Sequence, residues 1–230
     1  MINMMNGDCM DLMAKTPDKF YDLAIVDPPY GIGSPEKPTN KETRSKRIFN
    51  TKNRLNNGAG KLKNRTLNTS STLWDHSIPP PEYFSELYRV SKNQIIWGGN
   101  YFPLPPTRCI IVWDKVQPWE NFSQVEIAWT SFDSPAQLFR FDNRTGGKIH
   151  PTAKPVELYK YQVLKYAKPG DKILDTHGGS GSICIACHDL GFDLDWIEKD
   201  ADYYEAACRR YKEHAAQTEL FSFSGGEIQD

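Results

Sequence analysis

The sequence lacks the features of a membrane or secreted protein. No apolar run approaches the roughly 20 residues that span a bilayer, and Asp8 and Asp11 stand where a signal segment would be basic and then apolar. The five cysteines are scattered through 230 residues, and their odd number is typical of reduced thiols. We therefore expect a cytoplasmic protein with no disulfide framework and no membrane partner.

Residues at metal-ligand spacing are also scarce. Cys184 and Cys187 form a Cys-x-x-Cys pair, but the pair lies in an apolar stretch and no second pair occurs at ligand spacing. Cysteines in such surroundings usually behave as small buried hydrophobic residues. The sequence therefore predicts no metal site.

The net charge of −1 conceals an uneven distribution along the chain. Residues 34–74 contain ten basic and two acidic residues, a charge of +8, which leaves −9 for the rest. This segment has few large apolar residues, so it cannot bury enough surface to offset its ordering entropy. We expect a mobile basic arm that binds DNA, with Lys46, Arg47, Lys52 and Arg54 at the phosphates. A solvated loop without a partner is the alternative.

Residues 23–30 combine an apolar run with an unusual polar end. Residues 23–26 have the character of a buried parallel strand, and Asp27, Pro28, Pro29 and Tyr30 follow. An ionised carboxylate only accepts hydrogen bonds, prolines donate none from the backbone, and a tyrosine ring offers a stacking face. These properties favour a flat ligand that carries an amino group, such as a nucleobase. A strand-ending turn with nothing bound is the alternative.

A second strand-and-loop pattern lies near the other end of the chain. Residues 172–175 read as a strand that ends at Asp175, and Gly178, Gly179 and Gly181 precede a helix that begins at Ser182. Glycines at such a turn let the backbone approach a ligand closely. No Lys-Ser or Lys-Thr follows them, so the loop is not a phosphate-binding P-loop.

The remaining pattern alternates strands with helices, which predicts a mostly parallel sheet. Residues 94–102, 109–114, 125–130 and 193–198 read as strands, the first ending in a tight turn. Helices are expected at residues 10–15, 82–90, 156–167 and 203–214.

The two motifs, in this order, resemble the S-adenosylmethionine-dependent DNA amino-methyltransferases of the permuted beta type, in which Asp-Pro-Pro-Tyr precedes the glycine-rich cofactor loop. The resemblance implies a single α/β domain over residues 1–230, a Rossmann-like, doubly wound, mostly parallel sheet with helices on both faces. It implies that the strands ending at Asp27 and Asp175 are neighbours where the strand order reverses. The residues that it implies to be catalytic are Asp27, Pro28, Pro29 and Tyr30.

The same resemblance implies a set of cofactor-binding residues. Asp8 would accept from the adenine amino group of the cofactor, with Cys9 beside the ring, although Asp8 also suits the N-cap of the next helix. Thr152 and Lys154 would meet the cofactor carboxylate at a helix start, the alternative being an ordinary proline-initiated helix with a surface lysine. The others are Asp175, Gly178, Gly179, Gly181 and Glu198, the last at a strand end that suits ribose hydroxyls.

Two positions depart from the family pattern. The segment His150-Pro151-Thr152-Ala153-Lys154-Pro155 has Ala153 where the family commonly has Gln. His177 stands where relatives usually carry an apolar residue, although the glycine pattern that follows is intact.

The resemblance implies methyl transfer from S-adenosylmethionine to the exocyclic N6 of an adenine flipped out of duplex DNA. Adenine is favoured because the motif begins with Asp27, whereas relatives that methylate cytosine N4 usually begin with Ser. The alternatives are a catalytically inactive, methyltransferase-like DNA-binding subunit and an enzyme that acts on cytosine N4 or on RNA.

Two further segments concern partners. Residues 117–149 are the remaining place for a short target-recognition region, in which Trp119 and Phe122 are candidates to sandwich the base. We expect a flexible tail at residues 217–230, in which Gln217, Leu220 and Phe221 resemble the peptide that binds the replication sliding clamp. The sequence leaves a monomer and a homodimer equally open.

Overall fold

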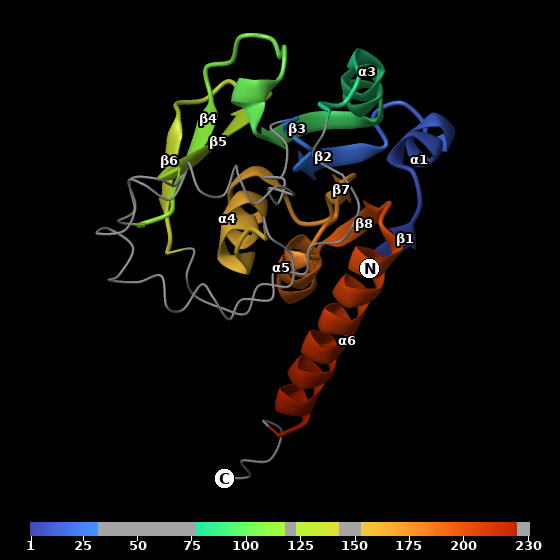
Figure 1. Ribbon diagram of the computed structural model, residues 1–230. Coiled ribbons are helices and arrows are strands. Elements are labelled where there is room, and N and C mark those ends of the chain that lie inside the picture. The colour runs from blue at the N-terminus through green and yellow to red at the C-terminus, as the bar shows by residue number, and fades with distance from the viewer. Residues whose placement is uncertain (32–76, 118–122, 143–152, 225–230) are drawn as a thin grey trace, which may run out of the picture.

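A computed structural model describes residues 1–31, 77–117, 123–142 and 153–224, with side chains described as far as Gln217. These residues form one eight-stranded sheet with helices on both faces, as Figure 1 shows. No helix within these ranges has the length and apolar character needed to cross a membrane. The strands are β1 (Ile2–Asn6), β2 (Tyr21–Val26), β3 (Ser91–Trp97), β4 (Ile110–Asp114), β5 (Val125–Thr130), β6 (Gln137–Arg140), β7 (Lys172–Asp175) and β8 (Asp193–Glu198). The helices are α1 (Cys9–Lys15), α3 (Pro81–Val90), α4 (Val156–Tyr166), α5 (Ser182–Leu190) and α6 (Ala201–Ser224), with a short 3₁₀ turn η2 (Gly99–Tyr101).

The strand order is β1-β8-β7-β2-β3-β5-β4-β6, and β5 runs antiparallel to both of its neighbours. At the centre, β2 pairs in parallel with β7, with Leu23 opposite Ile173 and Ala24 opposite Leu174. The chain leaves β2 toward β3 on one side and leaves β7 toward β8 on the other. The strand order therefore reverses between β2 and β7, which confirms the doubly wound, mostly parallel α/β fold expected from the sequence.

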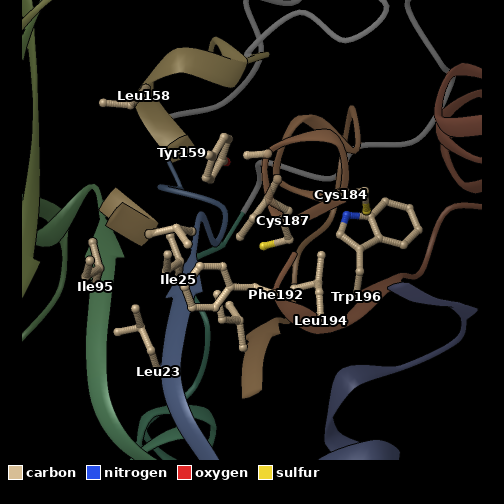
Figure 2. Packing of buried hydrophobic residues seen from close by; sticks show 14 of the residues in the cluster. Leu23, Ile25, Ile95, Leu158, Tyr159, Cys184, Cys187, Phe192, Leu194 and Trp196 are labelled. Atoms are coloured by element: carbon tan, nitrogen blue, oxygen red, sulfur yellow. The ribbon is translucent and has the colours of Figure 1, made fainter. Parts of the chain in front are cut away.

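The alternation of side chains along the strands divides the core into two layers. Leu23 and Ile25 of β2 pack in one cluster with Tyr159 of α4 and with Cys184 and Cys187 of α5 (Figure 2). Both cysteines are fully buried in this layer, as the sequence pattern indicated. Ala24 and Val26, which point to the opposite face, pack in a second cluster. That second cluster contains Met13 of α1 and Tyr83, Phe84, Leu87 and Val90 of α3.

Burial of both faces explains why β2 is an apolar run instead of an alternating one. Each fully buried Leu or Ile side chain contributes about 1.5–3 kcal/mol by leaving water. Leu23 and Ile25 are both almost completely buried, so this strand is firmly fixed in the centre of the sheet. The burial of β2 therefore also fixes the position of Asp27, which follows it directly.

Two elements differ from the sequence prediction. Residues 137–140 form β6, which pairs in parallel with β4, so the described part of the region 117–149 holds two strands of the central sheet, β5 and β6. Helix α6 continues past the expected end at residue 214 to Ser224, and so extends into the segment 217–230 that is predicted to be a flexible tail. Neither Gly nor Pro interrupts the sequence from Ala201 to Ser224, and helix formers such as Ala, Glu and Gln continue the pattern. Residues 225–230 lie outside the described residues, and the clamp-binding peptide stays a prediction.

Candidate active site

The Asp-Pro-Pro-Tyr motif begins directly after β2, at the carboxyl edge of the sheet. Asp175 is the last residue of the adjacent strand β7, so both carboxyl groups lie at the same edge. Asp175 is buried, and burial raises the pKa of its carboxyl to about 8, with the negative charges of Asp27 and Glu198 adding to the rise. The structure thus brings together the ends of two motifs that are about 150 residues apart in the sequence.

Both oxygens of the Asp27 carboxylate are engaged by neighbouring side chains. The hydroxyl of Tyr30 donates to Asp27 Oδ1 at 2.6 Å. The Nζ atom of Lys154 lies 2.5 Å from Asp27 Oδ2, in an ion pair shielded from solvent. Each oxygen of Asp27 therefore already has one partner within the protein, and its second lone pair is the one left for a ligand.

Lys154 lies among acidic and aromatic side chains and not in a surface position, since the residue is only 4% exposed. Its Nζ lies 3.2 Å from Glu126 Oε2, 3.3 Å from the Tyr30 hydroxyl and 5.1 Å from the centroid of the Trp97 ring. Burial disfavours the charged form, but Asp27 and Glu126 outweigh that effect and raise the pKa of Lys154. The sequence placed Lys154 beside the cofactor carboxylate, whereas the structure places it beside Asp27.

Glu126 of β5 is a member of this site that sequence reasoning did not single out. Its Oε1 atom pairs with Lys115 Nζ at 2.5 Å, and its Oε2 faces Lys154. Burial opposes ionisation of this carboxyl, but the two lysines lower its pKa below the ordinary value. The available signal was a lone carboxylate within a strand that is otherwise apolar or aromatic.

A glycine turn after β3 supports the ring of Tyr30. Gly98 has φ +71°, and a Cβ atom there would lie 2.2 Å from Tyr30 Cε1, so the ring requires glycine at this position. On the same turn, the ring of Tyr101 stacks on Tyr30 with centroids 4.9 Å apart and an interplanar angle of 13°. Tyr101 is 43% exposed, so the stack reaches from the buried motif to the surface. The aromatic face attributed to Tyr30 is thus shared with Tyr101, which the sequence did not identify.

The glycine loop after β7 is held by Glu198 from the end of β8. Gly179 donates its backbone N–H to Glu198 Oε2 at 2.7 Å, and Asp200 donates to Oε1 at 2.8 Å. A Cβ at Gly178 would lie 1.9 Å from the Trp196 ring, which shows how closely the loop crosses β8. Gly181 has φ +69° and precedes the first residue of α5. Glu198 therefore shapes the loop, with both of its oxygens accepting backbone N–H groups.

Asp8 caps the first helix at the same edge of the sheet. Its Oδ1 accepts from Met10 N at 2.9 Å, which confirms the N-cap interpretation, and its Oδ2 pairs with Lys199 at 2.9 Å. Cys9 is next to it, and burial, with the charge of Asp8, raises the pKa of its thiol to about 12, so the thiol stays protonated.

His177 lies within the second motif, directly after Thr176 and before the glycines. Its Nδ1 is 2.9 Å from Thr176 Oγ1, which in turn is 2.7 Å from the hydroxyl of Tyr83. Burial lowers the pKa of the His177 imidazole to about 4, so the ring is neutral at pH 7. The position that is usually apolar in relatives therefore carries an uncharged ring here.

The charge balance of this edge suits a cationic ligand. Asp175 accepts a backbone hydrogen bond from His177 N at 3.1 Å and stands near two further carboxylates, Asp27 and Glu198. The raised pKa leaves Asp175 protonated at pH 7, and a cationic group beside it, such as the sulfonium or the ammonium of S-adenosylmethionine, would favour its ionised form. The donor set of the described residues thus fits that cofactor.

Several residues predicted for the site lie outside the described residues. They are Thr152, the candidate aromatics Trp119 and Phe122, and the DNA-contacting residues Lys46, Arg47, Lys52 and Arg54. Their assignments stay predictions from the sequence.

Comparison with known proteins shows similarity to DNA methyltransferases. A family model described as DNA methylase, of the N6 and N4 type, matches residues 108–209. The chain is therefore similar to S-adenosylmethionine-dependent DNA methyltransferases over this segment. It is 25% identical over 248 residues to the type II methyltransferase M2.MboI of Moraxella bovis, across 92% of this chain and 88% of that protein.

Solved structures of similar proteins have the same fold. The M1.HpyAVI–SAM complex matches with a TM-score of 0.56 at 16% identity, covering 91% of this chain and all of that one. The cytosine-N4-specific PvuII DNA methyltransferase matches with a TM-score of 0.58 at 13% identity, covering 94% and 90% of the two chains. That protein is described as cytosine-N4-specific, so the fold alone does not distinguish adenine N6 from cytosine N4.

Proposed function

We propose that the protein transfers a methyl group from S-adenosylmethionine to the exocyclic N6 of an adenine flipped out of duplex DNA. The pairing of β2 with β7 supports this proposal, because it brings Asp27 and the cofactor loop after Asp175 to one edge of the sheet. In an open α/β sheet, ligands bind at the carboxyl ends of the strands where their order reverses.

The protein must activate the acceptor nitrogen more than the methyl group. The amino nitrogen of adenine is a poor nucleophile because its lone pair is delocalised into the ring, whereas the bound cofactor supplies an activated methyl group. The Asp27 carboxylate and the Pro28 carbonyl would accept the two N–H bonds and draw the nitrogen toward tetrahedral geometry. The same oxygens would stabilise the positive charge that grows there as the N–C bond forms and the S–C electron pair stays on sulfur. The methylated nitrogen then loses one proton.

The cofactor would be held by residues on the β7 and β8 side of the site. Asp175 offers a buried carboxyl to a cationic group, and Gly178, Gly179 and Gly181 let the backbone approach the ligand. Glu198 and Asp8 stand at neighbouring strand and helix ends, where the ribose and adenine would lie. His177 adds no competing positive charge, because its imidazole is neutral at pH 7.

Adenine is the proposed base because the motif begins with a carboxylate. Two hydrogen bonds position an exocyclic amino group, and unpairing the base costs a few kcal/mol that stacking on Tyr30 and Tyr101 would partly recover. The test uses tritiated cofactor with duplex DNA, single strands and RNA, followed by separation of the labelled nucleosides. We expect N6-methyldeoxyadenosine from duplex DNA. Label in N4-methyldeoxycytidine or mainly in RNA would replace the proposed substrate, and no transfer from a protein that binds DNA would indicate the inactive subunit.

Replacement of Asp27 tests the catalytic assignment. We expect Asp27→Ala and the better-matched Asp27→Asn to reduce the rate of transfer by at least about 10²–10³-fold, because the amino group loses its charged acceptor. The dissociation constant for S-adenosylmethionine, measured by calorimetry, should change by less than about threefold, since the cofactor loop is untouched.

The matched control is Asp133→Asn, which removes an exposed carboxylate that pairs only with the exposed Arg108 in the described part of the chain. This variant should keep full activity. Retained turnover in Asp27→Asn would contradict the assignment.

A further inference from the structure

Four charged side chains of alternating sign form a chain through the amino-acceptor site. Lys115 pairs with Glu126 at 2.5 Å, Glu126 lies 3.2 Å from Lys154, and Lys154 pairs with Asp27 at 2.5 Å. The side chain of Lys154 is only 2% exposed, and those of the other three are between 13% and 25% exposed. The two lysines balance the two carboxylates, so the chain is neutral as a whole.

The position of Lys154 conflicts with the proposed chemistry as it stands. Its ammonium group donates to the oxygen that would accept from the target amino group, and Tyr30 occupies the other oxygen. A fixed positive charge at this place would also oppose the positive charge that develops on the nitrogen during transfer. Each Asp27 oxygen can still accept a second hydrogen bond, so the obstacle is the ammonium charge, and a productive complex is favoured when Lys154 moves away from Asp27.

Glu126 provides a second place for the lysine. Its Oε1 is held by Lys115, whereas its Oε2 is shielded from solvent and makes no well-directed hydrogen bond within the described residues. That unsatisfied oxygen lies 3.2 Å from Lys154 Nζ. A short movement would satisfy it while keeping the ammonium beside the Trp97 ring and out of water. The Lys154 ammonium group can thus move from the Asp27 carboxylate to the Glu126 carboxylate and remain paired with a negative charge.

We infer that Lys154 is a built-in occupant of the amino-acceptor site, resting on Asp27 when no base is bound and moving to Glu126 when the target amino group arrives. Lys154 and Glu126 are then positioning residues: the first keeps Asp27 compensated in the empty site, and the second receives the lysine during turnover. This inference rests on the proposed function, because it assumes that Asp27 accepts the target amino group.

A double-variant cycle tests the exchange. Glu126→Gln removes the charge of the alternative acceptor but keeps its shape, so Lys154 should remain on Asp27 and compete with the base. We expect kcat/KM for DNA to fall by about tenfold, the scale of one hydrogen bond to a charged group. Adding Lys154→Met removes the competitor, so the double variant should be more active than Glu126→Gln alone. A purely structural role for either residue predicts the opposite, since each replacement would add to the damage.

The control in the same background is Lys168→Met, which replaces an exposed lysine beyond α4 and should bring no recovery. Binding of S-adenosylmethionine, measured by calorimetry, should be unchanged in Lys154→Met. Weaker cofactor binding there, or a double variant no more active than Glu126→Gln, would overturn the inference. If Lys154→Met loses cooperative thermal unfolding, Lys154→Gln takes its place in the cycle. Absence of transfer by the unaltered protein would instead refute the proposed function.

Discussion

Asp175 shows how a single buried carboxyl can make the stability of the protein depend on pH. Burial raises the pKa of this group to about 8 in the folded protein, far above its ordinary value of 3.8. Between these values the folded state holds a proton that the unfolded state has lost. The free energy of unfolding contributed by Asp175 therefore falls as pH rises through this window, by at most about 1.4 kcal/mol per pH unit.

Asp175→Asn should remove that dependence, because an amide does not titrate. Urea unfolding at pH 5 and pH 8 should show that the unaltered protein loses more stability over this interval than the variant does. Asp133→Asn, whose carboxylate is exposed, should behave as the unaltered protein. Equal slopes for the unaltered protein and Asp175→Asn would contradict the buried, protonated carboxyl.

Among individual residues, the sequence identified those whose role can be inferred from the residues next to them in the chain. Asp27 and Tyr30 were identified because a strand, two prolines and an aromatic ring occur in succession, and Asp175 because a strand ends there before glycines. The sequence did not identify Glu126 or the ion pair of Lys154 with Asp27. Both depend on segments that come together only when the sheet forms. A charged residue in the sequence indicates a partner of opposite sign but does not say which one.

The turn between β3 and η2 is the element that most directly supports the proposed catalytic motif, because Gly98 contacts the Tyr30 ring. Gly98 and Gly191 have nearly equal φ angles of +71° and +73°, but a Cβ at Gly98 would overlap the Tyr30 ring, whereas a Cβ at Gly191 would meet nothing within 4 Å. A comparison of alanine substitutions at the two glycines therefore separates the cost of backbone strain from the cost of a steric overlap with Tyr30.

Gly191→Ala should cost about 1–2 kcal/mol of stability, the usual penalty for a left-handed alanine. Gly98→Ala should cost more and should also lower the rate of methyl transfer, because Tyr30 must move and its hydroxyl holds Asp27. Chemical unfolding and turnover assays on both variants check the difference. Equal losses of stability, with activity retained in both, would show that the contact with Tyr30 is unimportant.

Among the helices and strands, those with a clear apolar pattern, or with Gly or Pro residues at their ends, were predictable from the sequence. The bounds of β5, β7 and β8 agree with the expected residues, and α5 begins at Ser182 as predicted. Strand β6 was missed because its four residues, Gln137–Arg140, are too short for a pattern, and pairing with β4 decides their conformation. Helix α6 extends ten residues beyond the predicted end at residue 214, because neither Gly nor Pro interrupts the sequence before Ser224.

For the whole molecule, the sequence predicts a division of charge between the basic segment and the remainder. The segment 34–74 carries +8 and lies outside the described residues, so its role in DNA binding is a prediction from composition. Replacement of Lys46, Arg47, Lys52 and Arg54 by glutamine should weaken DNA binding at low salt. It should also reduce the slope of log K against log salt by up to about 4, since each phosphate contact contributes about 0.9.

Affinity should be measured by fluorescence anisotropy at several salt concentrations. A matched control replaces four exposed lysines or arginines elsewhere, namely Arg108, Arg140, Lys165 and Lys168, which preserves the change in net charge. An unchanged slope in the first variant, or an equal change in the control, would remove the segment from the binding mechanism.

The central pair β2 and β7 also has a consequence for protein synthesis. A ribosome completes the Asp27 segment early, but the strand that must lie beside it emerges only after residue 175, and the support of the glycine loop only after Glu198. A nascent or prematurely terminated chain therefore has the proposed acceptor motif without the proposed cofactor loop beside it. Under the proposed function, a partial translation product that ends before residue 175 would have no methylating activity.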